Sequence, residues 1–346
     1  MSSVVLVMIV RNEARSLSRC LNSMRPWVDR MVIVDTGSAD DTVAIAESFG
    51  AEVHHMIWPD DFALARNRAL DLAKGDWHVV LDADEWLSNG GESLLKLRTM
   101  APDFVGTVTV NSVYVQSGIQ ACAPTALSRV LPGHVRYVGR IHEQPVHACP
   151  LRDLPVVIEH DGYLPAQMDQ KSDRNLRLLL RALDEEPDND YLLYQLGKDH
   201  EVHDRFDQAM QAYLRALNLC SGTARHRHDL VLRMLFCLKQ LHRLTEALQL
   251  AEQELPHWSH SADFHFTLGD VLLSHALTVS AEQAHDLLPM IESCWLRCLE
   301  LGDTLHLEGA VEGRGSHLAA YNLVVFYDSL GLKEKADPWR SLAKTT

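Results

Sequence analysis

Short apolar runs alternate with amphipathic segments over the first part of the chain. Residues 4–10 form a continuous apolar run closed by Arg11, which is the pattern of a strand buried on both faces of a parallel sheet. Further strand patterns follow at residues 31–34, 52–58 and 77–81, and helical patterns lie before or between them at residues 13–24, 40–49 and 62–73. Because strands and helices alternate at this pace, we expect βαβ units and an α/β fold with a doubly wound parallel sheet.

The pattern changes twice further along the chain. Residues 104–160 keep strand-like runs but lack clear helical periodicity, which predicts an irregular, partly antiparallel extension of the sheet. From about residue 168 onward, apolar positions recur with the 3.6-residue period of helices. We therefore predict two domains, an α/β domain over residues 1–165 and an all-α domain over residues 166–346.

The helical part carries an internal repeat. Gly197 and Ala209 lie twelve residues apart, and Tyr213 and Ala216 follow them. Small residues where two antiparallel helices touch, with a large side chain filling the gap beside them, are typical of tetratricopeptide (TPR) repeats. Weaker copies of the pattern are anchored at Leu235, Gly269 and Val324, paired with Ala247, Trp295 and Ala336. The spacing from Gly269 to Val324 is the longest between successive anchors, so we expect a TPR-like α-solenoid with an insertion in one unit. A generic helical bundle is the alternative.

Composition and charge limit the function classes. The chain has 346 residues, 47 acidic against 32 basic side chains and a formal charge of −15, which argues against a binder of nucleic acid or anionic membranes. The N-terminal apolar run is too short for a signal peptide or a membrane span, so we expect a cytoplasmic protein without an integral membrane segment. The seven cysteines include no C-x-x-C pair and are expected to be buried free thiols.

Three carboxylates follow the fourth predicted strand. The segment Leu81-Asp-Ala-Asp-Glu85 places Asp82 and Asp84 two residues apart, so both side chains lie on one face of an extended chain. Ligands of open α/β sheets bind at the carboxyl ends of the strands, and paired carboxylates there suit Mg²⁺ or Mn²⁺ bound to a diphosphate. Solvated strand-end carboxylates are the ordinary alternative. An aspartyl-phosphate phosphatase would need a hydroxyl at the position of Trp86, so that class is set aside.

The ends of the neighbouring strands are also polar. The first strand ends in Val10-Arg-Asn-Glu13, and the second in Asp35-Thr-Gly-Ser38, where Gly37 permits a close backbone approach. Arg66 lies on the helix before the fourth strand, and an arginine beside acidic strand ends suits a diphosphate held against a metal. Together these residues predict a phosphate-containing ligand at one edge of the sheet.

Four segments in this order resemble family 2 glycosyltransferases of the GT-A fold, a Rossmann-like fold that binds nucleotide-sugars. They are Val10-Arg-Asn-Glu13, Val34-Asp-Thr-Gly-Ser38, Phe62-Ala-Leu-Ala-Arg-Asn67 and Leu81-Asp-Ala-Asp-Glu85. The resemblance continues through residues 139–144 and 158–163 into the TPR-like part, and this layout is similar to that of bacterial peptide S-glycosyltransferases. It implies a nucleotide-diphospho-sugar donor, favours a UDP-sugar, and implies Mn²⁺ or Mg²⁺ as cofactor.

The resemblance also implies a set of site residues. Asp35 would reach the base or ribose, Arg66 the phosphates, and Asp84 the metal. The whole nucleotide-sugar set is Val10, Asn12, Glu13, Asp35, Gly37, Ser38, Arg66, Asp82 and Ala83, and the metal contacts are Asp84 and His142. Many relatives carry two consecutive acids where this chain has Asp35-Thr36, which leaves the identity of the base open.

An inverting transfer needs a base that takes the proton of the acceptor. Glu143 is the favoured base and His142 a metal or phosphate contact, because both lie at the polar end of the extended segment. Neighbouring side chains alternate along a strand, so only one of the two is expected to point into the site. Asp161 and His160 form the reserve pair.

These observations leave three hypotheses. The favoured one is a metal-dependent, inverting glycosyltransferase whose TPR-like domain holds a peptide or protein acceptor or forms a homodimer. The second is a TPR scaffold that has lost activity and binds nucleotide or protein partners. The third is a sugar transferase for cell-envelope polysaccharide, which shares the chemistry but uses another acceptor.

Overall fold

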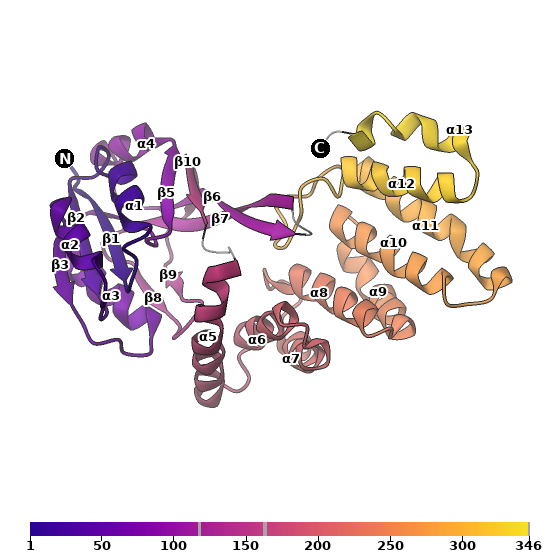
Figure 1. Ribbon diagram of the computed structural model, residues 1–346, viewed down its shortest axis with the longest axis horizontal. Coiled ribbons are helices and arrows are strands. Elements are labelled where there is room, and N and C mark those ends of the chain that lie inside the picture. The colour runs from indigo at the N-terminus through magenta and orange to yellow at the C-terminus, as the bar shows by residue number, and fades with distance from the viewer. Residues whose placement is uncertain (117–118, 162–164, 345–346) are drawn as a thin grey trace. The chain divides into compact units, whose positions relative to one another are not determined.

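The computed structural model describes residues 1–116, 119–161 and 165–344. The chain divides into two compact units, Met1–Ala182 and Leu183–Thr346 (Figure 1). Each unit has its own apolar cores. Gly162 and Tyr163, the last residues of the segment 158–163, lie outside the described residues.

The first unit is built on an eight-stranded sheet with the order β3-β2-β1-β4-β7-β6-β10-β5. Four strands are mutually parallel: β1 (Val4–Val10), β2 (Arg30–Asp35), β3 (Glu52–His55) and β4 (Trp77–Val80). The others are β5 (Glu85–Asn89), β6 (Val105–Gln116), β7 (Ile119–Pro132) and β10 (Leu151–His160), and a separate pair joins β8 (Arg136–Val138) to β9 (Gln144–Val146). Because β7 runs antiparallel to both β4 and β6, the expected α/β fold with a partly antiparallel extension is confirmed.

Strand β1 shows why helices cover both faces of this sheet. Its side chains alternate, so that Leu6 and Met8 enter one core while Val5 and Val7 enter the other. The first core receives α1 (Leu17–Met24), α2 (Thr42–Ser48) and α4 (Gly91–Lys96), and the second receives α3 (Phe62–Ala73). The polar ends of β1, β2 and β4 remain at one edge of the sheet, where the candidate site lies.

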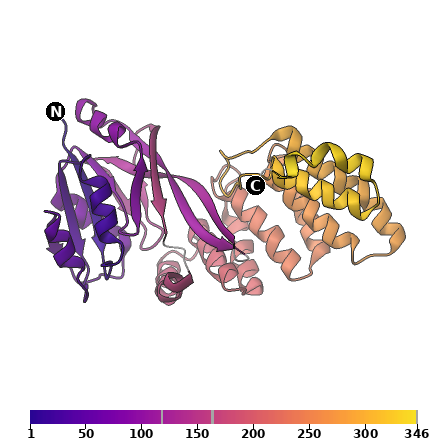
Figure 2. The same cartoon turned by 45° about the horizontal axis from the view of Figure 1, so that its top comes forward.

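The second unit consists of helices (Figure 2). They are α6 (Asp190–Val202), α7 (Phe206–Leu219), α8 (Arg227–Gln240), α9 (Leu244–Trp258), α10 (Ala262–Ala276), α11 (Ala281–Leu301), α12 (His317–Ser329) and α13 (Lys333–Ala336). Successive helices pack in pairs, α6 with α7 and onward to α12 with α13. The long helix α5 (Pro165–Glu185) precedes them, and short 3₁₀ turns lie at Leu97–Thr99, Asp337–Trp339 and Leu342–Lys344.

The contacts between paired helices follow the predicted repeat. A Cβ atom added to Gly197 on α6 would lie 2.2 Å from Cε1 of Tyr213 on α7, so only glycine allows this approach. The same arrangement recurs between Gly269 on α10 and Trp295 on α11, where the distance to Nε1 is 2.7 Å. The TPR-like packing is thereby confirmed, and the insertion occupies α11 and the loop of residues 302–316 after it.

The described cysteines are free thiols, and the described helices include no candidate membrane span. The six cysteines with described side chains are all free, and five of them are buried. Cys122 lies outside the described side chains. Among the described helices, none combines the length and the apolar character that crossing a bilayer requires.

Candidate active site

A cavity of about 280 Å³ opens at the carboxyl ends of β1 and β4. Eight of the residues that the sequence assigned to the site line it: Val10, Glu13, Arg66, Asp82, Ala83, Asp84, His142 and Glu143. A wider hollow of about 500 Å³ shares Arg11, Thr36 and Trp58 with this cavity and adds Asp35 and Gly37. The two spaces therefore adjoin, and together they offer room for an extended ligand. Asn12, Ser38 and Asp161 are not among the described residues that line either space.

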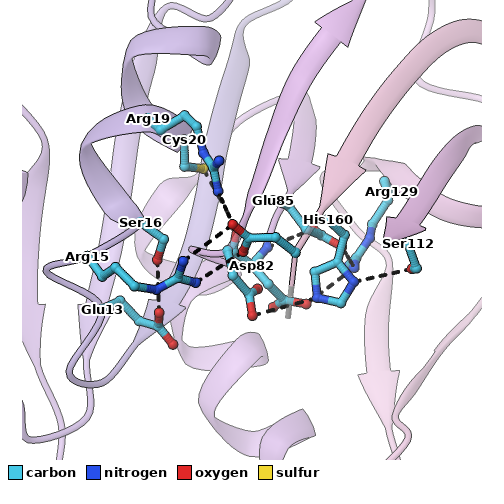
Figure 3. A network of polar contacts seen from close by, with 12 residues as sticks. Glu13, Arg15, Ser16, Arg19, Cys20, Asp82, Glu85, Ser112, Arg129 and His160 are labelled. Atoms are coloured by element: carbon cyan, nitrogen blue, oxygen red, sulfur yellow. Dashed lines mark hydrogen bonds and ion pairs between the residues drawn. The ribbon is translucent and has the colours of Figure 1, made fainter. Parts of the chain in front are cut away.

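Asp82 is held between two arginines (Figure 3 labels Asp82 and Arg129). Its Oδ1 accepts a hydrogen bond from Nη2 of Arg66 at 2.8 Å, and its Oδ2 accepts one from Nη2 of Arg129 at 3.2 Å. Arg66 also pairs through Nε with Glu143, and Arg129 also pairs with Glu85. Helix α3 and strand β7 thus join three acidic residues into one network of charge-assisted hydrogen bonds.

Burial and charge act in opposite directions on the acids of this network. Burial would raise the pKa of Asp82, but the charges of Arg66 and Arg129 hold that pKa well below its usual range. The pKa of Glu85 is instead raised, because its burial outweighs the attraction of Arg129. Asp82 is therefore an ionised carboxylate that anchors the two guanidinium groups.

Three arginines provide positive charge beside the cavity. Nη1 of Arg66 is buried and has no hydrogen-bond acceptor within the described part of the chain. Arg174 on α5 lines the cavity with Arg11, and the pKa of Arg174 is lowered by its burial and then by repulsion from Arg11. An anionic ligand between these groups would satisfy the Arg66 donor and relieve that repulsion.

Asp84 faces His160, the last residue of β10. Oδ2 of Asp84 lies 3.6 Å from Nε2 of His160, and Nδ1 of the same ring lies 3.2 Å from Oγ of Ser112 (Figure 3). Burial would lower the pKa of His160, but contact with the Asp84 carboxylate and its negative charge raise the pKa above its usual value. The bond to Ser112 orients the ring so that its second nitrogen points at the carboxylate, which is the usual support of a metal-binding histidine.

These side chains fit a divalent cation. A carboxylate oxygen and an imidazole nitrogen are suitable ligands for Mn²⁺, and a separation of 3.6 Å is longer than an ordinary hydrogen bond between them. His142, the histidine assigned to the metal from the sequence, lines the same cavity but lies in a turn with φ of 52°. The histidine beside Asp84 in this structure is thus His160, which the sequence analysis held in reserve.

Glu143 is placed by the turn of residues 139–143, which is fastened to the start of α3. The backbone amide of Phe62 donates to the carbonyl of Arg140 at 2.8 Å, and Nη1 of Arg140 donates to the carbonyl of Asp60 at 3.1 Å. Gly139 has φ of 100°, a conformation that glycine adopts without strain. The turn brings Glu143 to the cavity, where its side chain is 11% exposed.

Asn12, Asp35 and Ser38 form the support of the loop after β2. Oδ1 of Asn12 accepts the amide of Ala39 at 2.8 Å, and the amide of Asn12 donates to Oγ of Ser38 at 2.9 Å. Asp35 accepts the amides of Gly37 and Ser38 at 3.1 and 3.2 Å. Burial would raise the pKa of Asp35, but these hydrogen bonds from Ser38 and Gly37 lower it. These side chains shape the wider hollow by fixing its backbone.

Asp161 forms ion pairs with two arginines in and just before helix α1. Its carboxylate accepts from Nη2 of Arg15 at 3.1 Å and from Nη2 of Arg19 at 2.6 Å (Figure 3 shows both arginines). The guanidinium of Arg19 also lies 3.4 Å from the ring centre of Trp86. Burial would raise the pKa of Asp161, but the two arginines lower it. This geometry ties the end of β10 to the segment around α1.

Two important residues escaped the sequence analysis. Arg129 pairs with Asp82 and Glu85, and Arg174 faces the cavity, yet neither belongs to a recognised motif. Arg129 is a charged residue within the apolar run of residues 126–130. Because a buried charge requires a partner, its position there could have indicated a role in an ion pair. Arg174 lies on an amphipathic helix with several exposed arginines, so its position alone did not distinguish it.

Known proteins resemble the part of the chain that carries this site. Residues 5–116 match Glycosyl transferase family 2. The chain is 28% identical over 262 residues to the SPbeta prophage-derived glycosyltransferase SunS of Bacillus subtilis, covering 72% of this chain and 62% of that protein. It is 34% identical over 211 residues to a TPR repeat-containing protein of Synechococcus elongatus, covering 57% and 52% of the two chains. The chain thus spans less than two thirds of the length of these relatives.

The crystal structure of MamA is among the solved structures to which the chain was compared. That comparison has a TM-score of 0.39 at 14% identity and covers 51% of this chain and 89% of that one. The assignment therefore rests on the sequence relatives and on the contacts described above. On those grounds residues 5–116 are similar to glycosyl transferase family 2, and TPR-like helical repeats follow in the second unit.

Proposed function

We propose that this protein is a metal-dependent, inverting glycosyltransferase that moves a sugar from a nucleotide-diphospho-sugar to a peptide or protein. The observation that carries the proposal is the pairing of Asp84 with His160 in a cavity that Arg66 and Arg174 also line. A potential metal site and cationic side chains therefore lie together at the strand ends where α/β sheets bind their ligands. The family 2 domain supports glycosyl transfer as the reaction.

The two adjoining spaces suggest how the donor binds. The nucleoside occupies the wider hollow beside Asp35 and Trp58, and the sugar occupies the cavity of about 280 Å³. The diphosphate lies between them near Arg66, whose buried Nη1 has no acceptor among the described residues. A divalent cation held by Asp84 and His160 would neutralise the charge of the leaving diphosphate when bound. UDP is the favoured nucleotide.

Glu143 is the proposed base. Its Oε1 binds Nε of Arg66, which leaves Oε2 to take the proton as the acceptor attacks the sugar carbon. Arg66 in turn binds Asp82, so the orientation of Glu143 depends on an ionised carboxylate at the end of β4. Asp161, the reserve candidate, pairs with Arg15 and Arg19, and we assign it to positioning of the α1 segment.

The acceptor is proposed to bind the helical unit. A cavity of about 260 Å³ lies between α8 and α10 and is closed by residues 309–314 of the insertion loop. It offers the rings of Phe236 and Phe266 together with Arg233 and Asp270, so it can hold a peptide through apolar and charged side chains. The helical unit also exposes large apolar side chains, which suggests that two copies of the chain associate through their helices.

The test is turnover of nucleotide-sugars. We expect UDP release from at least one UDP-sugar with Mn²⁺, and a fall of about 10² to 10⁴-fold in Asp84→Asn and in Glu143→Gln. Asp71→Asn is the matched control, because Asp71 is an exposed acid on α3 that pairs with Arg136. The assignment is wrong if Asp84→Asn keeps the full rate.

A binding measurement separates the enzyme from an inactive scaffold. A scaffold would gain thermal stability from a nucleoside diphosphate with Mn²⁺ yet release no UDP from any donor. The acids gathered around Asp82 favour the enzyme. Neighbouring carboxylates repel each other and lower the stability of the fold, so they are expected where they bind a cation or take part in catalysis. A transferase for polysaccharide would release UDP with a glycan acceptor but not with peptides.

A further inference from the structure

Three metal-ligating side chains meet in the helical unit, outside the residues that resemble family 2. Asp190 is the first residue of α6, Cys220 follows the end of α7, and His226 precedes α8. Their ligand atoms all lie within 4.8 Å of one another, and the described residues contain no other such group of three. Cys220 and His226 are buried, with 8% and 9% of their surfaces exposed.

His226 contacts both of its partners in this cluster through one ring nitrogen. Nε2 of His226 lies 3.3 Å from Oδ2 of Asp190 and 3.6 Å from Sγ of Cys220. In a proton-relay triad the acid and the nucleophile use different nitrogens of the imidazole. One nitrogen carries either one proton or one lone pair, so it does not relay a proton between these two partners. The arrangement instead resembles three ligands around a common centre.

The distances fit a tetrahedral metal. Bonds of about 2.3 Å to sulfur and about 2.0–2.1 Å to nitrogen or oxygen place neighbouring ligand atoms roughly 3.3–3.6 Å apart at tetrahedral angles. The two distances at Nε2 of His226, 3.3 and 3.6 Å, lie in that range. A mixed set of thiolate, imidazole and carboxylate suits Zn²⁺ better than Mg²⁺ or Ca²⁺, which prefer oxygen ligands alone.

The surroundings hold the ligands in place. The ring of His226 lies against Tyr194 and Tyr191, with centroid distances of 5.2 and 5.5 Å. Asn189 caps α6 by accepting the amide of Leu192 at 3.0 Å, which fixes the turn that carries Asp190. The ligand positions therefore depend on packing and helix capping that exist without a metal.

We propose that Asp190, Cys220 and His226 bind one Zn²⁺ ion, with water as the fourth ligand. Binding releases the thiol proton of Cys220 to solvent and changes no oxidation state. The ion joins the first helical pair to the start of the second, so its role is to stabilise the TPR-like unit. This site is separate from the metal proposed for sugar transfer, and its failure would leave that proposal intact.

Co²⁺ is the probe, because thiolate coordination produces a charge-transfer absorption that carboxylate and imidazole ligands do not produce. The full chain is expected to bind Co²⁺ with this band, and Zn²⁺ is expected to displace it at one equivalent. Cys220→Ser should abolish the band, and His226→Gln should weaken Co²⁺ binding by about 10 to 100-fold. The absence of a thiolate band in the full chain would overturn the proposal.

Two further variants exclude simpler explanations. Cys149→Ser is the matched control, because Sγ of Cys149 lies 3.8 Å from Nε2 of His134 and so forms a cysteine–histidine pair elsewhere in the chain. The band must survive in Cys149→Ser, and its loss there would refute the assignment. Asp190→Asn tests the carboxylate ligand, whose side chain is 31% exposed; unchanged Co²⁺ affinity with a native circular dichroism spectrum would overturn the three-ligand site.

Discussion

Arg129 stands within strand β7 and connects two acids that no other described arginine connects. Its Nη2 contacts both Asp82 and Glu85, and its side chain is 12% exposed. The charges of Arg66 and Arg129 together lower the pKa of Asp82, which binds both guanidinium groups. The charge state of the acids beside the proposed donor site thus depends on cations that come from both α3 and β7.

Removal of that cation is expected to destabilise the first unit. Arg129→Met keeps the side-chain length but leaves Glu85 buried without its partner, so the free energy of unfolding should fall by about 3 kcal/mol in urea titrations. Arg136→Met is the control, since Arg136 pairs with Asp71 at the surface and should cost less than about 1 kcal/mol. Equal losses in the two variants would contradict the network's role.

At the scale of single residues, the sequence motifs predicted the acids that line the cavity but not all of the side chains that contact those acids. Asp82, Asp84 and Glu143 follow from motifs, because motifs record residues at fixed spacing along one segment. Arg129 and His160 reach the site from β7 and β10, whose positions beside β4 and β5 depend on strand order. Pairing of strands distant in the sequence is set by long-range packing, so spacing alone does not predict which histidine faces Asp84.

The second unit is built from paired helices. Among the described glycines at contacts between paired helices, Gly197 on α6 has the tightest contact, with Tyr213 on α7. The repeat was predictable because it needs small residues at regular spacing on neighbouring helices. The loop of residues 302–316 was predictable only as extra length. Its backbone position follows from buried side chains on other helices, among them Asp263, which accepts the amide of Val311 at 2.8 Å.

Gly197→Ala is expected to destabilise the helical unit. The added methyl would lie 2.2 Å from the ring of Tyr213, and the overpacking should cost about 1–3 kcal/mol despite the better helix propensity of alanine. Gly222→Ala is the matched control, because a Cβ there meets no atom within 4 Å. Urea unfolding followed by circular dichroism measures both, and similar stability of the two variants would contradict the contact.

His228 fastens the insertion loop and makes the unit sensitive to acid. Its Nδ1 lies 2.7 Å from the carbonyl of Glu308 and its Nε2 lies 2.7 Å from Oγ of Ser261, so the neutral ring satisfies both contacts. Burial lowers the pKa of His228, so the unfolded chain takes up the proton at a higher pH than the folded chain. The stability given by the neutral ring is complete above a pH of about 6.5 and is lost as the pH falls through the folded pKa.

The expected result is a lower free energy of unfolding at about pH 5.5 than at about pH 7.5, by about 1 kcal/mol for this group. His228→Gln should reduce that difference, and it should also lower stability at the higher pH. His257→Gln is the control, because His257 is exposed on α9. A pH difference that persists unchanged in His228→Gln would show that another group causes it.

At the scale of the whole molecule, the chain combines two units that have separate cores and separate proposed metal sites. A ligand that binds only the folded form of one unit stabilises that unit, by about 2.7 kcal/mol at a hundredfold excess over its Kd. Calorimetry of the full chain should therefore show UDP with Mn²⁺ raising one unfolding transition and Zn²⁺ raising the other. Asp84→Asn should remove the first shift alone and His226→Gln the second alone. Loss of the Zn²⁺ shift in Asp84→Asn, or loss of the UDP shift in His226→Gln, would contradict the assignment of one metal to each unit.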